Sequence, residues 1–144
     1  QLRRFSTVGW RMPIRERAAT AEMAESLHLR AASLDMPVGE LSGGNQQKVA
    51  LAKWILTHPR VLLLDEPTRG VDVGAKREIY LLMNEWTKKG IAILVVSSEM
   101  PELLAMSDRV VVMHRGQRMA EFSREEATPE LVLEAAMGMR KKMV

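Results

Sequence analysis

The sequence predicts an α/β fold whose sheet contains parallel strands. Two apolar runs, 61–64 and 91–96, have the length and composition of strands that are buried on both faces. Between them, residues 75–89 predict a helix that Gly90 ends, with Ile79, Leu82, Met83 and Trp86 on one stripe. A strand, a helix and a second strand in this order form the repeating unit of a parallel sheet.

The first third of the chain is expected to be mainly helical. Residues 14–29 carry apolar side chains at helical spacing, whereas residues 1–13 show no clear period. Turn-forming residues over 33–44 indicate a loop that ends where a second helix begins. That helix is expected over 45–56, and its predicted apolar side comprises Val49, Ala52, Trp54, Ile55 and Leu56.

The last third of the chain predicts a short helix, a hairpin and a final helix. Ser98 is expected to cap the short helix, which ends near Met106. Residues 110–113 and 117–122 flank a turn and predict a β-hairpin. Thr128-Pro129 then opens the final helix, because Pro is well tolerated in a first turn.

The composition of the 144 residues excludes several classes of function. There is no Cys, so disulfides, thiolate zinc sites and cysteine nucleophiles are excluded. The excess of three positive charges is Arg140, Lys141 and Lys142, and the rest of the chain is neutral, which gives no reason to propose a nucleic-acid partner. No apolar run approaches the roughly 20 residues that cross a bilayer. The chain starts at Gln1 without a leader, so we expect it to be part of a longer one.

The run Leu41-Ser-Gly-Gly-Asn45 directly precedes the second helix. Two Gly let the backbone approach an anion, the hydroxyl of Ser42 can donate, and the N–H groups of a first helical turn favour negative charge. Such a run also occurs as a plain loop and cap, and that alternative stays open for this motif alone.

A second group of polar residues, Asp65 and Glu66, follows the first predicted strand. Ligands of open α/β sheets bind at the carboxyl ends of strands. In nucleotide hydrolases an Asp at that place holds Mg²⁺, and the neighbouring Glu is placed to polarise the attacking water. The alternative is that both carboxylates accept hydrogen bonds from nearby backbone N–H groups.

Together these two motifs resemble those of one family. Leu41-Ser-Gly-Gly-Asn-Gln-Gln-Lys48 resembles the signature motif of ATP-binding-cassette (ABC) ATPases, and Leu62-Leu-Leu-Asp-Glu-Pro-Thr68 resembles their Walker B motif. Arg69-Gly-Val-Asp72 stands in the place of the D-loop. The run from Asp65 to Lys76 and Val96-Ser-Ser-Glu-Met-Pro-Glu102 look like the second cassette of importers of monosaccharides (ribose, galactose or xylose) or of autoinducer-2.

The resemblance implies part of a P-loop NTPase fold, with a C-terminal hairpin and part of a helical subdomain. Residues 1–58 would belong to that subdomain and carry the signature motif. Residues 59–126 would hold the Walker B, D-loop and switch-region part of the ATPase core, and residues 127–144 a last helix with a basic tail.

The resemblance also implies ATP and Mg²⁺ as cofactors and a second cassette as partner. Leu41, Ser42, Gly43, Gly44, Asn45 and Gln46 would form the signature segment, which touches the γ-phosphate of an ATP held by the partner cassette. Asp65 would hold Mg²⁺ at a different ATP, Glu66 would act there in catalysis, and Asp72 would couple the two sites. Transmembrane permease subunits are the other expected partners, which places the protein peripherally at the cytoplasmic face of the bacterial inner membrane.

The sequence departs from the family pattern in two places. No G-x-x-x-x-G-K-[ST] run occurs, so the Walker A motif is absent from this chain and the isolated chain is expected to be inactive as an ATPase. Ser98 stands at the position of the switch histidine and lacks the reach and charge of an imidazole. We therefore expect the chain's own ATP site to be hydrolytically weak.

Two alternatives to an ATPase subunit of a sugar importer stay open. The chain is alternatively a non-catalytic regulatory or interaction module, or a soluble ABC-type ATPase that is not coupled to transport. A chain without the Walker A strand leaves a sheet edge and an apolar face uncovered, so self-association of this chain is expected.

Overall fold

The computed structural model describes residues 6–7, 10–11 and 13–139, so the basic segment 140–142 lies outside the described residues. The chain divides into two compact units, residues 1–94 and 95–144. The three-part division expected from the family stays a prediction. Within the described ranges, no helix is both long and apolar enough to cross a bilayer.

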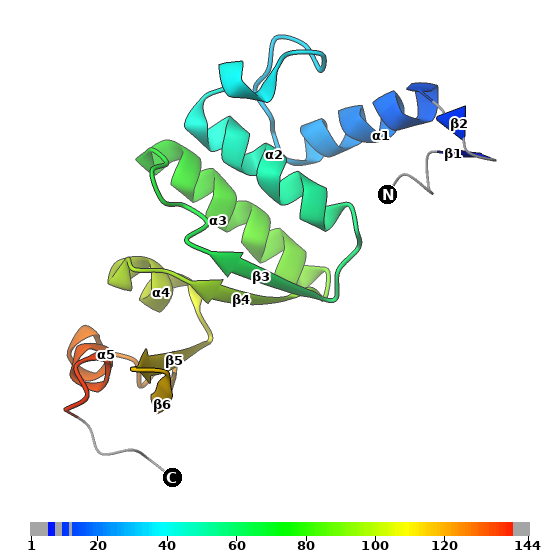
Figure 1. The fold of residues 1–144 in the computed structure, drawn as a ribbon. Coiled ribbons are helices and arrows are strands. Elements are labelled where there is room, and N and C mark those ends of the chain that lie inside the picture. Colours follow the sequence, from blue (N-terminus) through cyan, green and yellow to red (C-terminus); the bar gives the residue numbers. More distant parts are fainter. Residues whose placement is uncertain (1–5, 8–9, 12, 140–144) are drawn as a thin grey trace. The chain divides into compact units, whose positions relative to one another are not determined.

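The first unit consists mainly of helices and one parallel strand pair (Figure 1). Its elements are β1 (Ser6–Thr7), β2 (Trp10–Arg11), α1 (Pro13–Ser26), the 3₁₀ turn η2 (Val38–Glu40), α2 (Gly43–Ile55), β3 (Val61–Asp65), α3 (Val73–Lys88) and the first residues of β4 (Ala92–Val96). The antiparallel pair β1–β2 was not expected, because the segment around it shows no period.

β3 and β4 form one two-stranded sheet, and α3 connects them. Both strands point the same way in Figure 1, so the predicted parallel arrangement is confirmed. The stripe predicted for α3 is also correct, since Ile79, Leu82, Met83 and Trp86 are its buried residues. Gly90 has φ +88°, a left-handed conformation that favours glycine and ends the connection after the helix.

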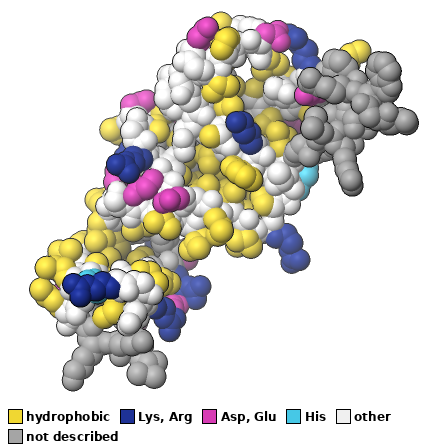
Figure 2. All heavy atoms as spheres, in the orientation of Figure 1, with side chains coloured by type: hydrophobic (Ala, Val, Ile, Leu, Met, Phe, Trp, Pro, Cys, Tyr) yellow, Lys and Arg dark blue, Asp and Glu magenta, His cyan; other side chains and the backbone are white. Residues whose placement is uncertain are grey.

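The expectation that both strands are buried on both faces is wrong. Along β3, Leu62 and Leu64 are buried, whereas Val61 is 59% and Leu63 70% exposed. Leu94 of β4 is 57% exposed. The alternation arises because no described element of the first unit covers the second face of this strand pair. Figure 2 shows hydrophobic side chains at the surface of the region that carries β3 and β4.

Helix α2 begins two residues earlier than predicted, so both Gly of the Ser-Gly-Gly run lie in its first turn. Its buried residues are Gly44, Lys48 and Leu51, not the predicted apolar side, and Trp54 is 62% exposed. A Cβ built on Gly44 would lie 2.4 Å from the Cβ of Ala75 in α3. Gly44 therefore permits a close approach of α2 and α3 near the start of each helix.

A buried cation joins three segments of the first unit. The Nζ of Lys48, a residue only 1% exposed, donates to Glu78 Oε2 of α3 at 2.5 Å and to the carbonyl oxygen of His28 at 3.0 Å. Arg30 Nη2 donates to the other oxygen of Glu78 at 3.3 Å. The hydrogen bond from Lys48 is the main cause that holds the pKa of Glu78 below its ordinary value of 4.5.

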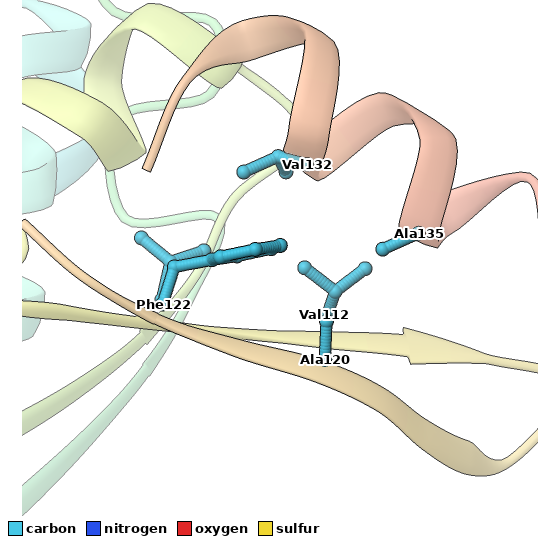
Figure 3. Packing of buried hydrophobic residues seen from close by; sticks show 6 residues of the cluster. Val112, Ala120, Phe122, Val132 and Ala135 are labelled. Atoms are coloured by element: carbon cyan, nitrogen blue, oxygen red, sulfur yellow. The ribbon is translucent and has the colours of Figure 1, made fainter. Parts of the chain in front are cut away.

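The second unit is a hairpin covered by a helix. It contains the end of β4, α4 (Met100–Met106), β5 (Arg109–His114), β6 (Gln117–Ser123) and α5 (Pro129–Ala136). The predicted hairpin is confirmed, and its turn residues Arg115 and Gly116 both have positive φ, as a type I′ turn requires. Figure 3 shows Val132 and Ala135 of α5 facing Val112, Ala120 and Phe122 of the hairpin.

The cap predicted for the short helix is wrong by one residue. Glu99, not Ser98, is the N-cap of α4. The hydroxyl of Ser97 accepts from the Glu99 N–H at 3.1 Å and donates to the buried carboxylate of Glu102. These bonds form a turn ahead of the helix and shift its start. Pro101 lies in the first turn as expected, and Thr128 caps α5.

We predict that Gly44→Ala destabilises the first unit by about 1–3 kcal/mol, because the new Cβ forces the two helices apart. Adding Ala75→Gly removes the clashing atom, so the double variant should return close to the original stability. Urea unfolding measures both changes. Gly39→Ala is the matched control, since a Cβ there meets nothing within 4 Å and should change stability by less than about 0.5 kcal/mol. Failure of Ala75→Gly to rescue Gly44→Ala would contradict the close approach.

The depressed pKa of Glu78 predicts a pH-dependent stability. A carboxylate whose pKa is lowered by folding stabilises the fold above its unfolded pKa, and this contribution is lost as the pH falls through the folded pKa. Glu78→Gln should therefore cost about 3 kcal/mol at pH 7, because it leaves the buried ammonium of Lys48 without a counter-charge, although 36% of the Glu78 side chain is open to water. The cost should shrink as the pH falls below 4.5. Urea unfolding at pH 7 and pH 3 measures the difference, with Glu85→Gln on the exposed side of α3 as the matched control.

Candidate functional site

The starts of α2 and α3 enclose an open hollow of about 300 Å³ in the first unit. Its lining comes from the loop after α1 and from both helices: Arg30, Ser42, Gly44, Asn45, Asp72, Gly74, Ala75 and Glu78. Three residues of the predicted signature segment thus meet the residue predicted for the D-loop. The first turns of two helices contribute N–H groups to this region, and such groups favour an anion.

The signature segment is held by side-chain hydrogen bonds around its polar residues. Ser42 is the N-cap of α2, but its hydroxyl accepts no first-turn N–H. It accepts instead from Asn45 Nδ2 at 2.9 Å, and Asn45 Oδ1 accepts from the Arg30 N–H at 3.1 Å. The amide of Gln46 donates to the carbonyl oxygen of Leu41 at 2.8 Å. Leu41 is buried and Gly43 is exposed, so the segment is fixed at its first residue and accessible to solvent at the start of α2.

Asp72 has a structural role that the sequence reasoning did not assign to it. It is the N-cap of α3, and its Oδ1 accepts from the Ala75 N–H at 2.9 Å. The helix N-terminus therefore compensates part of the negative charge that Asp72 brings to the hollow. The proposed coupling role of Asp72 stays a prediction.

Asp65 and Glu66 lie at the carboxyl end of β3, as the sequence predicts. Asp65 is exposed, and Glu66 is half-buried with φ +47°. That left-handed conformation is unfavourable for a residue other than glycine, and it turns the chain sharply directly after the strand. The two residues that follow Glu66, Pro67 and Thr68, are fully buried. Neither carboxylate lines the hollow between α2 and α3.

Ser98 lies in the second unit, between β4 and α4, and its side chain is exposed. A hollow of about 430 Å³ in that unit is lined by residues around His114 and Met137, and none of the predicted site residues lines it. The role of Ser98 at the switch position stays a prediction.

The residues of this chain fit the Mg²⁺-binding part of a nucleotide site, but they do not include the P-loop that binds the phosphates. An exposed carboxylate at a strand end suits Mg²⁺, which keeps several waters and needs only one or two protein carboxylates. No group of three His, Cys, Asp or Glu gathers within the described residues. The Gly-rich backbone cradle of a P-loop does not occur in the sequence.

The sequence reasoning missed Arg30, Lys48 and Glu78. Lys48 follows Gly44 by four residues and precedes Leu51 by three, so helical spacing alone places it on the buried side of α2. A buried Lys requires a partner, and this is the signal that was available. The identity of that partner depends on how α3 packs, and the sequence does not reveal it.

Comparisons with known proteins agree with these motifs. Residues 5–69 match the family model described as ABC transporter. The chain is 52% identical over 137 residues to the ribose import ATP-binding protein RbsA of Oceanobacillus iheyensis, covering 95% of this chain. It spans only 28% of the length of that relative.

Solved structures of ATP-binding cassettes have the same fold. The cassette MJ1267 of an ABC transporter in its ADP conformation is 31% identical, with a TM-score of 0.71, and the match covers 84% of this chain and 49% of that one. A second structure of MJ1267 gives 29% identity and a TM-score of 0.73 over the same shares. The protein cbiO1 from Clostridium perfringens, part of the ABC transporter complex cbiONQ, is 28% identical with a TM-score of 0.66 over 90% of this chain and 51% of its own.

The signature and Walker B motifs, the parallel strand pair and these relatives lead to one conclusion. All of them point to the ABC transporter ATPases, and the chain is similar to a segment of an ATP-binding cassette.

Proposed function

We propose that this chain is part of the ATP-hydrolysing subunit that supplies energy to a sugar ABC importer. The observation that carries the proposal is the hollow at the starts of α2 and α3, where Ser42, Gly44 and Asn45 of the signature segment are gathered. The similarity to a ribose import ATP-binding protein supports sugar as the class of cargo.

In this proposal Ser42, Gly43 and Gly44 contact the γ-phosphate of an ATP that a partner cassette holds. Ser42 and Gly43 are exposed, and the first turn of α2 directs N–H groups toward a bound anion. Asp72, which also lines the hollow, stands where the two cassettes meet and couples their sites. The partner is the other half of a tandem ATPase or a second subunit.

A separate ATP is served by the strand-end carboxylates. Asp65 holds Mg²⁺, which neutralises phosphate charge when bound, and Glu66 accepts a hydrogen bond from the attacking water and polarises it. Ser98 replaces the switch histidine and supplies no imidazole, so we propose that this second site turns over slowly. The Walker A residues come from chain outside these 144 residues.

The subunit is proposed to act beneath transmembrane permease subunits, peripherally at the cytoplasmic face of the bacterial inner membrane. The similarity to an importer's ATP-binding protein supports this location. No observation favours the alternatives of a soluble ABC-type ATPase or of an interaction module for the intact protein. The absence of a Walker A motif does support a chain that is inactive by itself.

The two sites are expected to differ in their importance for turnover. In the intact ATPase, Ser42→Phe should lower kcat about 100-fold, because it blocks the donors that stabilise phosphate charge. Glu66→Gln should lower kcat less than about threefold, because its site contributes little. Ala50→Phe, an equally bulky change on the exposed side of α2, is the control. Steady-state ATP hydrolysis measures all three, and equal losses for Ser42→Phe and Glu66→Gln would contradict the asymmetry.

The uncovered face of β3 and β4 is proposed to cause self-association of the isolated chain. Val61, Leu63 and Leu94 are each more than half exposed there, which is an unusual surface for a monomer. Sedimentation at tens of micromolar should show dimers or larger species. Leu63→Lys should shift the distribution toward monomer, whereas Leu81→Lys on α3, equally a charge at an exposed leucine, should not. A monomeric parent chain would overturn this proposal.

A further inference from the structure

The orientation of the Asn45 side chain follows from its two partners. The Arg30 backbone N–H lies 3.1 Å from Oδ1 of Asn45. A backbone N–H can only donate, so an oxygen must face it. The amide nitrogen of Asn45 is thereby directed toward Ser42, whose hydroxyl oxygen lies 2.9 Å away. The exchange of nitrogen and oxygen would bring two donors together at Arg30.

The Asn45 amide also determines whether the Ser42 hydroxyl donates or accepts in their hydrogen bond. The amide nitrogen of Asn45 carries only donors, so the oxygen of Ser42 must accept in this bond. A hydroxyl has a single proton, and accepting a hydrogen bond leaves that proton available for a different acceptor. Ser42 is exposed and lines the hollow at the start of α2.

We infer that Asn45 is a positioning residue that directs the hydroxyl of Ser42 to donate into the hollow, toward the anion bound there. The inference rests on the proposed function, in which that anion is a phosphate of ATP held by the partner cassette. Asn45 acts through Ser42, and the loop after α1 in turn holds Asn45 through the Arg30 backbone.

The charges around the hollow make an oriented donor important. The guanidinium of Arg30 is paired with Glu78, and Glu78 is also bound by the buried ammonium of Lys48. The carboxylate of Asp72 caps α3 in the same hollow. The side chains therefore offer an anion no unpaired excess of positive charge within the described lining, and hydroxyl and backbone N–H donors must supply the attraction.

A double-mutant cycle on the intact ATPase tests the inference. Ser42→Ala should lower kcat/KM for Mg-ATP about tenfold, the loss of one hydrogen bond to a charged group. Asn45→Ala should lower it about threefold. The double variant should match Ser42→Ala within about twofold, because without the hydroxyl Asn45 has nothing to orient. Asn84→Ala on the exposed side of α3 is the matched control and should leave kcat/KM unchanged.

Asn45→Asp supplies a readout that a purely structural role would not move. An ionised carboxylate only accepts, so it draws the Ser42 proton away from the hollow and adds a negative charge. Its activity should be below that of Asn45→Ala at pH 8. Relative to the parent, it should rise as the pH falls toward the carboxyl pKa of about 3.9, because a protonated carboxyl again donates to Ser42.

The outcomes distinguish a failure of the positioning role of Asn45 from a failure of the proposed function. Multiplicative losses for Ser42→Ala and Asn45→Ala, or an Asn45→Asp variant with the same activity and pH profile as Asn45→Ala, would overturn the positioning role alone. A Ser42→Ala variant with unchanged kcat/KM would overturn the proposed function of the signature segment itself.

Discussion

The arrangement of the first unit depends on where one buried ammonium group finds its acceptors. Lys48 is almost fully enclosed, and an unpaired charge in that place would be strongly unfavourable. Its bonds to Glu78 of α3 and to the His28 carbonyl oxygen link α2 with the two segments beside it. One turn earlier, Gly44 lets α2 approach Ala75 closely. Gly44, Ala75 and Glu78, which make these contacts, also line the hollow, so the shape of the hollow depends on them.

The same contacts explain why the signature segment is both rigid and open. Within it, Gln46 donates to the Leu41 carbonyl oxygen, Asn45 accepts from the Arg30 N–H of the loop after α1, and the Leu41 side chain is buried. Ser42 is exposed, its hydroxyl oxygen accepts from Asn45, and its hydroxyl proton is available to a bound anion. A preorganised donor of this kind needs no rearrangement when an anion arrives. The carboxylates after β3 do not line this hollow, which supports the proposal that they serve a different nucleotide site.

The sequence predicted those features that depend on local pattern. The stripe of α3, the hairpin with its Arg115-Gly116 turn and the start of the final helix at Thr128-Pro129 are confirmed, because each needs only neighbouring residues. The apolar side of α2 was wrong, since Lys48 and Gly44 are buried only because of α3. The strands were expected to be covered on both faces, yet Leu63 is exposed, because the covering of a strand depends on how other elements pack and not on its own residues. For the same reason the sequence located the residues of the candidate site but not Arg30 and Glu78 beside it.

The central claim is that this chain supplies a signature segment and strand-end carboxylates but no cradle for the phosphates of ATP. Isothermal titration calorimetry of Mg-ATP into the 144-residue chain tests it most directly, with Asp65→Asn as the control. We predict no binding up to millimolar nucleotide. Micromolar binding that Asp65→Asn abolishes would contradict the account, since a phosphate site would then assemble from residues of this chain alone.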